Sequence, residues 1–271
     1  MSVGRCPPRS QPLWKEWDQK AQKNGLRHQV YAINGDCYTG EWTNNMKHGK
    51  GMQIWKKNGA IYEGDWKLGK REGYGTLSLP NPETGKYRRV YSGWWADNKK
   101  SGYGTQFYGT TEYYEGEWCQ NQRCGWGRMY YKNGDIYEGQ WLEDRRHGEG
   151  MLRLKNGNRY EGQWQKDMKN GPGCFFHLDH GQLFKGFWVD DMPKCGTMTD
   201  FGREQAPAPT KFPIPQIKIQ DPDGVLEEAL SSFKKTEVEE EEEEESQYQR
   251  PGPTDRLSWR LGQDEAVGKG R

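Results

Sequence analysis

The chain has 271 residues, with 40 Lys and Arg against 39 Asp and Glu, so its formal net charge is +1. Leu, Ile, Val and Phe together number only 36, too few for a large aliphatic core. The 13 Trp, 15 Tyr and 36 Gly residues exclude a wholly disordered chain, because disordered chains are poor in aromatic residues. The composition therefore predicts a packed domain with an aromatic core.

Targeting and cysteine patterns favour a cytoplasmic protein. No apolar stretch approaches the roughly 18 residues of a membrane span, and the first residues lack the apolar segment of a signal peptide. The six cysteines are scattered and no Asn-x-Ser/Thr acceptor occurs, which agrees with a reducing compartment.

Residues 1–24 form an N-terminal segment that contains Pro7, Pro8 and Pro12, followed by Trp14 and Trp17. Two interpretations stay open. The tryptophan pair belongs either to a degenerate cap that covers the first open edge of a sheet, or to a loose tail.

Residues 25–198 repeat one pattern: Tyr, then Gly at +2, Trp at +4, and Gly at +11 and +13. Copies start near residues 38, 62, 91, 114, 137, 160 and 184. The seventh copy is eroded, since Cys195 and Thr197 stand where the last two glycines are expected. The six intact copies contribute the structural pairs Tyr38 and Trp42, Tyr62 and Trp66, Tyr91 and Trp95, Tyr114 and Trp118, Tyr137 and Trp141, and Tyr160 and Trp164.

Each copy predicts a β-hairpin, because Tyr, Gly and Trp at alternate positions share one face of a strand. Asn-Gly pairs such as Asn34-Gly35 precede four tyrosines and indicate tight turns with both central residues at positive φ. Asn, Asp or Gly also lies three residues after each repeat tryptophan, at a second expected turn. Glycine between two aromatic residues predicts that rings of the adjacent hairpin lie against bare backbone.

The predicted fold is all-β: an elongated single-sheet array of about seven β-hairpins. The interval between the second and third copies is 29 residues, so the segment 79–85 predicts a lengthened hairpin tip.

The chain after the array changes in composition. Residues 199–235 predict a Pro-rich linker and then a short helix, with Leu226, Leu230 and Phe233 on one face as a candidate contact. Residues 236–271, which include seven consecutive glutamates from Glu239 to Glu245, predict a disordered acidic and then polar tail.

A basic residue follows each of the six intact tryptophans at +5, and stacked hairpins would align these residues along one edge. They are either solvated charges that discourage edge association, or a ridge that binds acidic partner segments or an anionic membrane surface. The near-neutral chain argues against nucleic acid as a partner, while open sheet edges allow self-association. The six residues are Lys47, Arg71, Lys100, Arg123, Arg146 and Lys169.

Sequence signals for catalysis and cofactors are weak. Gly-x-Gly segments such as Gly73-Tyr74-Gly75 enter strands rather than helices, and no phosphate-binding loop or nucleophile elbow occurs. Cys119 and Cys124 lack a second cysteine pair, and His177 and His180 lack further ligands for zinc. The aromatic residues fit a stacking platform for bases or sugars, but packing of the array is the favoured role. We expect no enzyme activity, no cofactor and no metal.

The spacing Tyr-x-Gly-x-Trp followed by Gly-x-Gly resembles the MORN repeat (membrane occupation and recognition nexus) over about residues 38–197. The resemblance implies a hairpin array without catalysis that acts as a scaffold or tether. It also implies a setting in male germ cells, in flagellar or cytoskeletal structures, or on the cytosolic side of secretory vesicles.

We therefore expect a non-enzymatic adaptor, which holds one partner protein on the array and another at the basic edge or the C-terminal helix. The alternative is a peripheral membrane module that binds anionic phospholipid through the basic edge. A third hypothesis is a mechanical component of a flagellar assembly.

Overall fold

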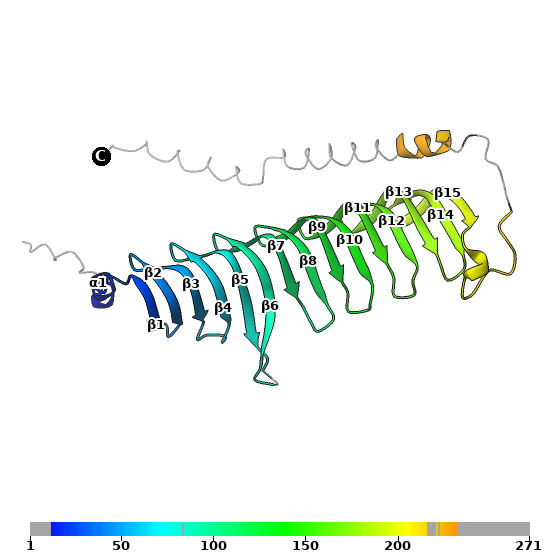
Figure 1. The fold of residues 1–271 in the computed structure, drawn as a ribbon. Coiled ribbons are helices and arrows are strands. Elements are labelled where there is room, and N and C mark those ends of the chain that lie inside the picture. Colours follow the sequence, from blue (N-terminus) through cyan, green and yellow to red (C-terminus); the bar gives the residue numbers. More distant parts are fainter. Residues whose placement is uncertain (1–11, 83, 216–220, 222, 232–271) are drawn as a thin grey trace, which may run out of the picture. The chain divides into compact units, whose positions relative to one another are not determined.

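The structure is a computed structural model that describes residues 12–82, 84–215, 221 and 223–231. The chain divides into two compact units, residues 1–218 and 219–271. Within the described part of the first unit, fifteen strands follow one another in chain order in a single antiparallel sheet (Figure 1). This arrangement confirms the predicted all-β array of hairpins.

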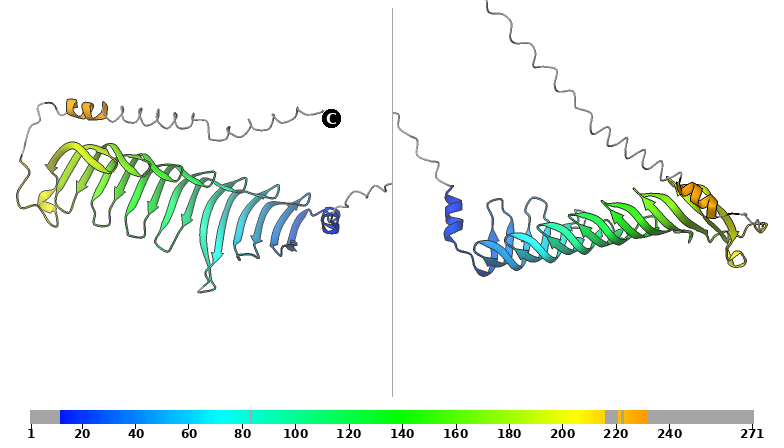
Figure 2. Two further views of the ribbon diagram at one scale, coloured as in Figure 1. Left: turned by 180° about the vertical axis from the view of Figure 1, so that it is seen from behind. Right: turned by 90° about the horizontal axis from the view of Figure 1, so that it is seen from above.

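The sheet consists of β1, which follows the short helix α1, and of seven hairpins that pair each even-numbered strand with the next strand. Neighbouring strands are rotated against one another, as is usual in open sheets (Figure 2). The elements are α1 (Leu13–Lys20), β1 (Gly25–Tyr31), β2 (Cys37–Thr43), β3 (Met46–Ile54), β4 (Ile61–Lys67), β5 (Lys70–Pro80), β6 (Tyr87–Ala96), β7 (Lys99–Phe107), β8 (Tyr113–Cys119), β9 (Gln122–Tyr130), β10 (Ile136–Leu142), β11 (Arg145–Arg153), β12 (Arg159–Gln165), β13 (Met168–His177), β14 (Gln182–Val189), β15 (Met192–Asp200) and the 3₁₀ helix η1 (Arg203–Gln205).

A row of glycines crosses the sheet, because the glycines of neighbouring strands are direct register partners from Gly40 in β2 to Gly196 in β15. Each repeat tyrosine lies over this row. A Cβ added at Gly51 would lie 2.1 Å from Tyr38 Oη, so no larger residue fits there. This tyrosine belongs to the same hairpin as the glycine, whereas the ring of the adjacent hairpin that reaches the glycine backbone is the tryptophan, as Trp66 Nε1 does by donating to Gly51 O at 3.1 Å.

The repeat tyrosines and tryptophans form the core on one face of this single-layer sheet. Each tyrosine makes T-shaped contacts with the tryptophan of its own repeat and with that of the next, as Tyr114 does with Trp118 and Trp141 at 5.3 Å between ring centroids. Tyr114 is fully buried, and Trp118 and Trp141 are almost so. The contacts run unbroken from Tyr38 to Trp188 and join all seven hairpins.

The seventh hairpin keeps its glycine pair, contrary to the eroded pattern expected from the sequence. Gly186 in β14 pairs with Gly196 in β15, because this hairpin has one residue fewer between its tryptophan and its second glycine. The fixed spacing therefore missed Gly196, which takes the place of the second expected glycine, whereas the first is absent because Lys194 stands two residues before Gly196.

The two kinds of turn differ from the expected assignment. At the Asn-Gly ends only the glycine has positive φ, as at Gly35, while Ala32 N donates to Asp36 O around a three-residue loop. At the tryptophan ends both central residues have positive φ, as at Glu143 (49°) and Asp144 (68°). The tight two-residue turns thus follow the tryptophans, and the left-handed residues predicted three positions after each tryptophan are confirmed.

The flanking segments follow the prediction in part. Residues 13–20 form α1, and β5 and β6 extend beyond the other strands at the lengthened tip. In the second unit residues 223–231 are helical, and Asp221 Oδ1 caps this helix by accepting a hydrogen bond from Gly224 N. Leu226 and Leu230 are half-buried on it. Phe233 and the acidic tail lie outside the described residues, so the helix contact stays a prediction.

Candidate interaction surfaces

The six basic residues after the tryptophans, here called the cation row, stand directly behind the tight turns. Each is the second residue of the strand that leaves the turn, so its side chain reaches back over the aromatic face. The row consists of Lys47 in β3, Arg71 in β5, Lys100 in β7, Arg123 in β9, Arg146 in β11 and Lys169 in β13.

Each cation of the row lies between two rings of successive repeats. The Arg146 guanidinium is 5.6 Å from the ring centroid of Tyr137 in its own repeat and 4.2 Å from that of Trp164 in the next. Lys47, Arg71, Lys100, Arg123 and Lys169 repeat this arrangement. A cation over an aromatic face is attracted by the ring quadrupole, more strongly where water is excluded.

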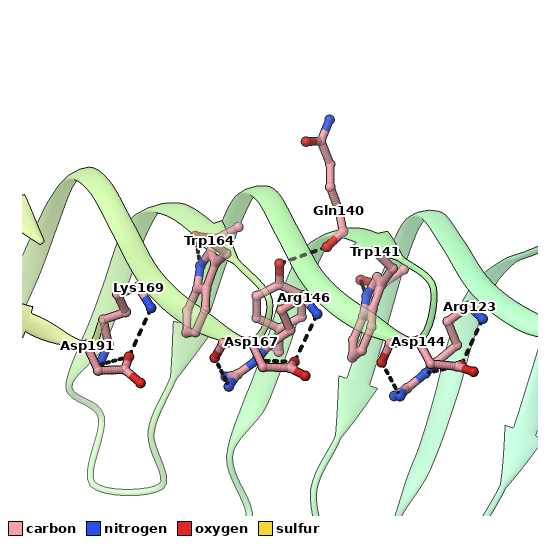
Figure 3. Close-up of polar contacts among 12 residues, drawn as sticks. Arg123, Gln140, Trp141, Asp144, Arg146, Trp164, Asp167, Lys169 and Asp191 are labelled. Atoms are coloured by element: carbon pink, nitrogen blue, oxygen red, sulfur yellow. Dashed lines mark hydrogen bonds and ion pairs between the residues drawn. The ribbon is translucent and has the colours of Figure 1, made fainter. Parts of the chain in front are cut away.

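The turn of the next repeat bonds to the backbone O of every residue of the cation row, and in four of the six it also bonds to the cationic side chain. Asp167 Oδ1 accepts hydrogen bonds from the backbone N of Arg146 at 2.9 Å and from its Nε at 3.2 Å, and Asp167 O accepts one from Nη2 at 2.6 Å (Figure 3). Arg123 with Asp144 and Lys169 with Asp191 are arranged in the same way (Figure 3). These bonds hold the turn residues in the left-handed conformation that L-residues otherwise disfavour.

The cation row therefore differs from a row of solvated charges, which was one of the two interpretations that the sequence left open. Its six residues are half-buried, and the side chains of Arg123, Arg146 and Lys169 are only 17–20% exposed. Burial lowers the pKa of Lys100 to about 8, a shift that an exposed lysine would not show. The structure gives these cations a role in joining repeats, and a role in binding partners or lipid stays a prediction.

Lys23 is a further member of this arrangement that the sequence pattern did not reveal. Its Nζ lies 5.0 Å from the ring centroid of Trp42, and its backbone N and O bond to Asn45 as those of Arg71 bond to Asn98. The available signal was its spacing, 24 residues before Lys47. No Tyr-x-Gly-x-Trp precedes it, so Lys23 does not belong to a copy of the repeat pattern.

The other face of the sheet, here called the outer face, carries four exposed aromatic side chains in neighbouring repeats. Their exposed fractions lie between 49% and 58%. Three of them occupy the middle of Gly-x-Gly segments, where alternation along the strand places them opposite the glycine row. This outer aromatic patch consists of Tyr74, Trp94, Tyr103 and Trp126.

Register and contacts link the residues of the outer aromatic patch in two pairs. Tyr74 and Trp94 are cross-strand partners with ring centroids 6.0 Å apart in a T-shaped contact. Tyr103 pairs with Glu117, whose Oε1 accepts a hydrogen bond from Trp126 N at 3.2 Å. The patch thus extends from β5 to β9 around one carboxylate.

The sequence contains a signal for this patch in the middle residues of its Gly-x-Gly segments. Equivalent Gly-x-Gly positions hold Lys50 in an earlier repeat and Glu149 and Pro172 in later ones, so aromatic residues are confined to the middle of the array.

Comparison with known proteins agrees with the repeat geometry. The MORN repeat family matches residues 38–60, 62–81, 91–110, 114–136, 137–159 and 160–176. The chain is 80% identical to the MORN repeat-containing protein 3 of Bos taurus over 239 residues, which cover 88% of this chain and 99% of the bovine protein. The chain belongs to the MORN repeat family.

Further MORN relatives match over a similar share of the chain. The Homo sapiens protein of that name is 80% identical over 237 residues, covering 88% of this chain and 99% of the human one. The Xenopus laevis protein is 61% identical over 229 residues, covering 84% of this chain and 96% of the frog one. MORN repeats typically form scaffolds that bind proteins or membranes, and the family is generally non-catalytic.

The polar groups inside the MORN array serve the repeat itself. Burial raises the pKa of each repeat tyrosine, and Tyr137 Oη donates to Gln140 O at 3.0 Å. Five repeat tryptophans donate from Nε1 to a glycine carbonyl of the preceding repeat, as Trp141 does to Gly127 O at 3.2 Å. These groups are occupied in packing and hydrogen bonding.

The cysteines of the described residues include one disulfide-bonded pair and three free thiols. The structure joins Cys119 to Cys124 by a disulfide across the turn between β8 and β9, whereas the sequence predicts no pairing of these two cysteines. Cys37, Cys174 and Cys195 are free. Within the described ranges, acidic, cysteine and histidine side chains form no group that could hold a metal ion, and no helix has the length and apolar character of a membrane span.

Proposed function

We propose that the protein is a non-enzymatic scaffold that binds partner proteins through the outer aromatic patch of its MORN array. One observation carries this proposal. Tyr74, Trp94, Tyr103 and Trp126 are about half exposed on the outer face, although the repeats are already joined by the aromatic core on the other face. Although Tyr74 and Trp94 also contact one another across two hairpins, about half of each of these four side chains stays open to a partner.

The chemistry of the patch suits a protein partner. Tyr and Trp supply large contact areas with few rotatable bonds and dominate the binding energy of many interfaces. With neighbouring strands about 4.8 Å apart, the patch spans roughly 20 Å across the sheet. The exposed Glu117 lies within it, so a Lys or Arg in the bound segment would complement its charge.

The alternative of a membrane-binding module rested on an exposed cation row, and the burial of this row argues against it. The cation row lies between rings and under turn residues, which leaves exposed basic residues such as Lys70, Lys99 and Arg145 to meet a phospholipid surface. Lys70 pairs with Asp97, and Lys99 Nζ donates to Gln120 Oε1 at 2.6 Å. The ion pair with Asp97 reduces the charge that Lys70 offers to lipid, and the hydrogen bond to the neutral Gln120 occupies one donor of Lys99.

The cellular setting stays a prediction that rests on family resemblance. We propose that the partner is met in male germ cells, in a flagellar or cytoskeletal assembly or on the cytosolic side of secretory vesicles.

The test is affinity capture from testis extract with three forms of the full chain: wild type, Trp94→Ala with Trp126→Ala, and a control with Glu149→Ala and Pro172→Ala. The control residues are exposed at the equivalent Gly-x-Gly positions of later repeats. We expect quantitative mass spectrometry to find proteins retained by wild type and control and lost from the patch variant. Equal recovery by all three forms, with equal melting temperatures, would contradict the proposal.

Flotation with vesicles that contain phosphatidylserine tests the membrane alternative. Reversing the charges of the cation row would break the repeat junctions, so the suitable variant reverses Lys70, Lys99 and Arg145 to Glu. We expect weak flotation for wild type and variant. Strong flotation that the reversal abolishes would favour the membrane module instead.

A further inference from the structure

The first repeat ends in an incomplete junction. At an internal junction Trp66 contacts the preceding Tyr38 at 5.4 Å and the cation of Lys47 at 4.8 Å. Trp42 has the equivalent cation, since Lys23 lies over its ring. Among the described residues, however, the ring contact recorded for Trp42 is with Tyr38 of its own repeat, and its buried Nε1 has no acceptor.

The sequence explains what is missing at this junction. Tyr38 lies nine residues before Lys47, and nine residues before Lys23 stands Trp14. Two residues later the chain has Glu16 instead of glycine, so a ring could not lie against bare backbone there. Residues 13–20 form α1 rather than a strand, and β1 is the second strand of a repeat whose first strand is absent.

A cavity of about 920 Å³ opens at this place, between α1 and the first strands of the sheet. Its walls are largely apolar, and several are open to solvent: Trp14 is 55% exposed, Trp17 72% and Ile33 70%. Trp42 and Lys23, which lack an aromatic ring from a preceding repeat, also line it. Exposed tryptophan and isoleucine around one hollow are unfavourable unless something covers them.

We propose that this N-terminal cavity is a docking site for a segment of a partner protein that inserts one aromatic side chain against Lys23 and Trp42. The inserted ring continues the aromatic core by one step, in the position that Tyr38 has relative to Lys47 and Trp66. It covers the exposed walls and lies within reach of a cation, as every internal tyrosine of the array does. This site is separate from the outer aromatic patch and gives the scaffold a second contact.

The chain's own first residues do not supply this ring. Residues 1–11 contain no Phe, Tyr or Trp, and Pro7 and Pro8 lack backbone donors. A second copy of the chain and the chain's own C-terminal segment are the remaining occupants, and the experiment separates both from a partner.

The probe is a fluorescein-labelled peptide that copies β4, residues 61–67 (Ile-Tyr-Glu-Gly-Asp-Trp-Lys), with blocked ends. Its control is the same peptide with Tyr62→Ala. Binding to the full chain is measured by fluorescence anisotropy, with Trp17→Ser and Ile33→Ser together as the cavity variant and Trp94→Ser as the control on the outer patch. Trp17 and Ile33 are exposed, so the cavity variant should keep the fold, which its melting temperature checks.

We expect saturable binding that weakens at least about tenfold when the peptide loses its tyrosine or the protein carries the cavity variant, because loss of an aromatic anchor has effects of this size. Trp94→Ser should leave the affinity unchanged. Absence of saturation up to about 1 mM peptide, or equal affinity for both peptides, would overturn the proposal.

Two further outcomes would assign the cavity to another occupant and would therefore also overturn the proposal of a partner protein. A molar mass by light scattering that rises with concentration, and falls in the cavity variant, would indicate a second copy of the chain. Peptide binding that emerges only after Tyr248→Ala with Trp259→Ala would indicate the chain's own C-terminal segment. Failure of this site leaves the scaffold proposal standing, because its test uses Trp94 and Trp126 only.

Discussion

The guanidinium of Arg123 lies 4.2 Å from the ring centroid of Trp141, a residue of the next repeat, and its Nε lies 3.0 Å from Asp144 Oδ1 of the turn that follows. It is also 5.7 Å from the ring of Tyr114 in its own repeat. One side chain thus connects two hairpins through two rings and a carboxylate. Because each repeat contacts only its neighbours, the stability of the array depends on such junctions.

Replacing Arg123 by Ala should lower the free energy of unfolding by about 2–4 kcal/mol. The change removes two cation–π contacts and the side-chain hydrogen bonds to Asp144, so that only the backbone of residue 123 still bonds to this left-handed turn. Urea unfolding followed by tryptophan fluorescence measures the loss.

The matched control is Arg145→Ala, which removes a neighbouring but exposed arginine. This change should stay within about 0.5 kcal/mol of wild type. Equal effects of the two substitutions would show that Arg123 does not hold the junction.

The buried Lys100 should make the free energy of unfolding higher in mildly alkaline solution than at neutral pH. Burial lowers its pKa from 10.5 to about 8 against the opposing charge of Asp144, with Arg123 and Arg71 lowering it further. The unfolded chain therefore binds more protons between these two values, so the contribution of Lys100 to the free energy of unfolding increases as pH rises through that window.

Lys100→Arg removes this dependence because a guanidinium stays charged. Between pH 7 and pH 9.5 the stability of wild type relative to the variant should rise by about 1 kcal/mol, after discounting for partial exposure. Denaturant unfolding at the two pH values measures the difference. If the difference in free energy of unfolding between the two proteins is the same at both pH values, the pKa of Lys100 is not lowered. The rings of Tyr91 and Trp118 would then stabilise the charged form of Lys100.

Gly150 should not tolerate alanine. A Cβ at this position would lie 2.4 Å from Tyr137 Oη and displace a ring that is fully buried. We expect Gly150→Ala to reduce the free energy of unfolding by about 2–4 kcal/mol through overpacking and loss of the hydroxyl's hydrogen bond.

Gly109→Ala serves as the comparison for Gly150→Ala. A Cβ added there meets its nearest neighbour, Glu112 Cβ, at 3.9 Å, which is ordinary contact. This variant should unfold like wild type within about 0.5 kcal/mol. Thermal melts of both variants decide the matter, and similar melting temperatures would refute the steric argument.

Much of the fold could be predicted from the sequence, because the signature residues act locally. Tyr137, Gly139 and Trp141 share one strand face by alternation alone, and Asp144 adopts the left-handed conformation predicted for it. The turn at the other end was assigned wrongly. Asn-Gly fits either a two-residue turn or a longer loop with one left-handed glycine, and the loop formed is the one compatible with the register of the flanking strands.

The candidate sites could be predicted less well. The spacing placed the cation row correctly along the sheet, but a spacing does not tell which charges find a ring or a carboxylate at the next repeat. The outer aromatic patch depends on which residues remain exposed when the sheet has a single layer. Tyr74 and Tyr62 have equal hydrophobic character in the sequence, yet Tyr62 is fully buried and Tyr74 is half exposed.

The sequence alone determined the repeat length, the strand faces and the need for glycine beside each tyrosine, because these follow from contacts within a single hairpin. Only the tertiary structure decided the partners that come from the next hairpin, namely the tryptophan ring over each cation and the Asp carboxylate that bonds to Arg123, Arg146 and Lys169. It also decided that a helix stands where a first strand is missing. Such contacts depend on how far neighbouring hairpins rotate and shift against each other, and the packing of all the side chains together sets that geometry.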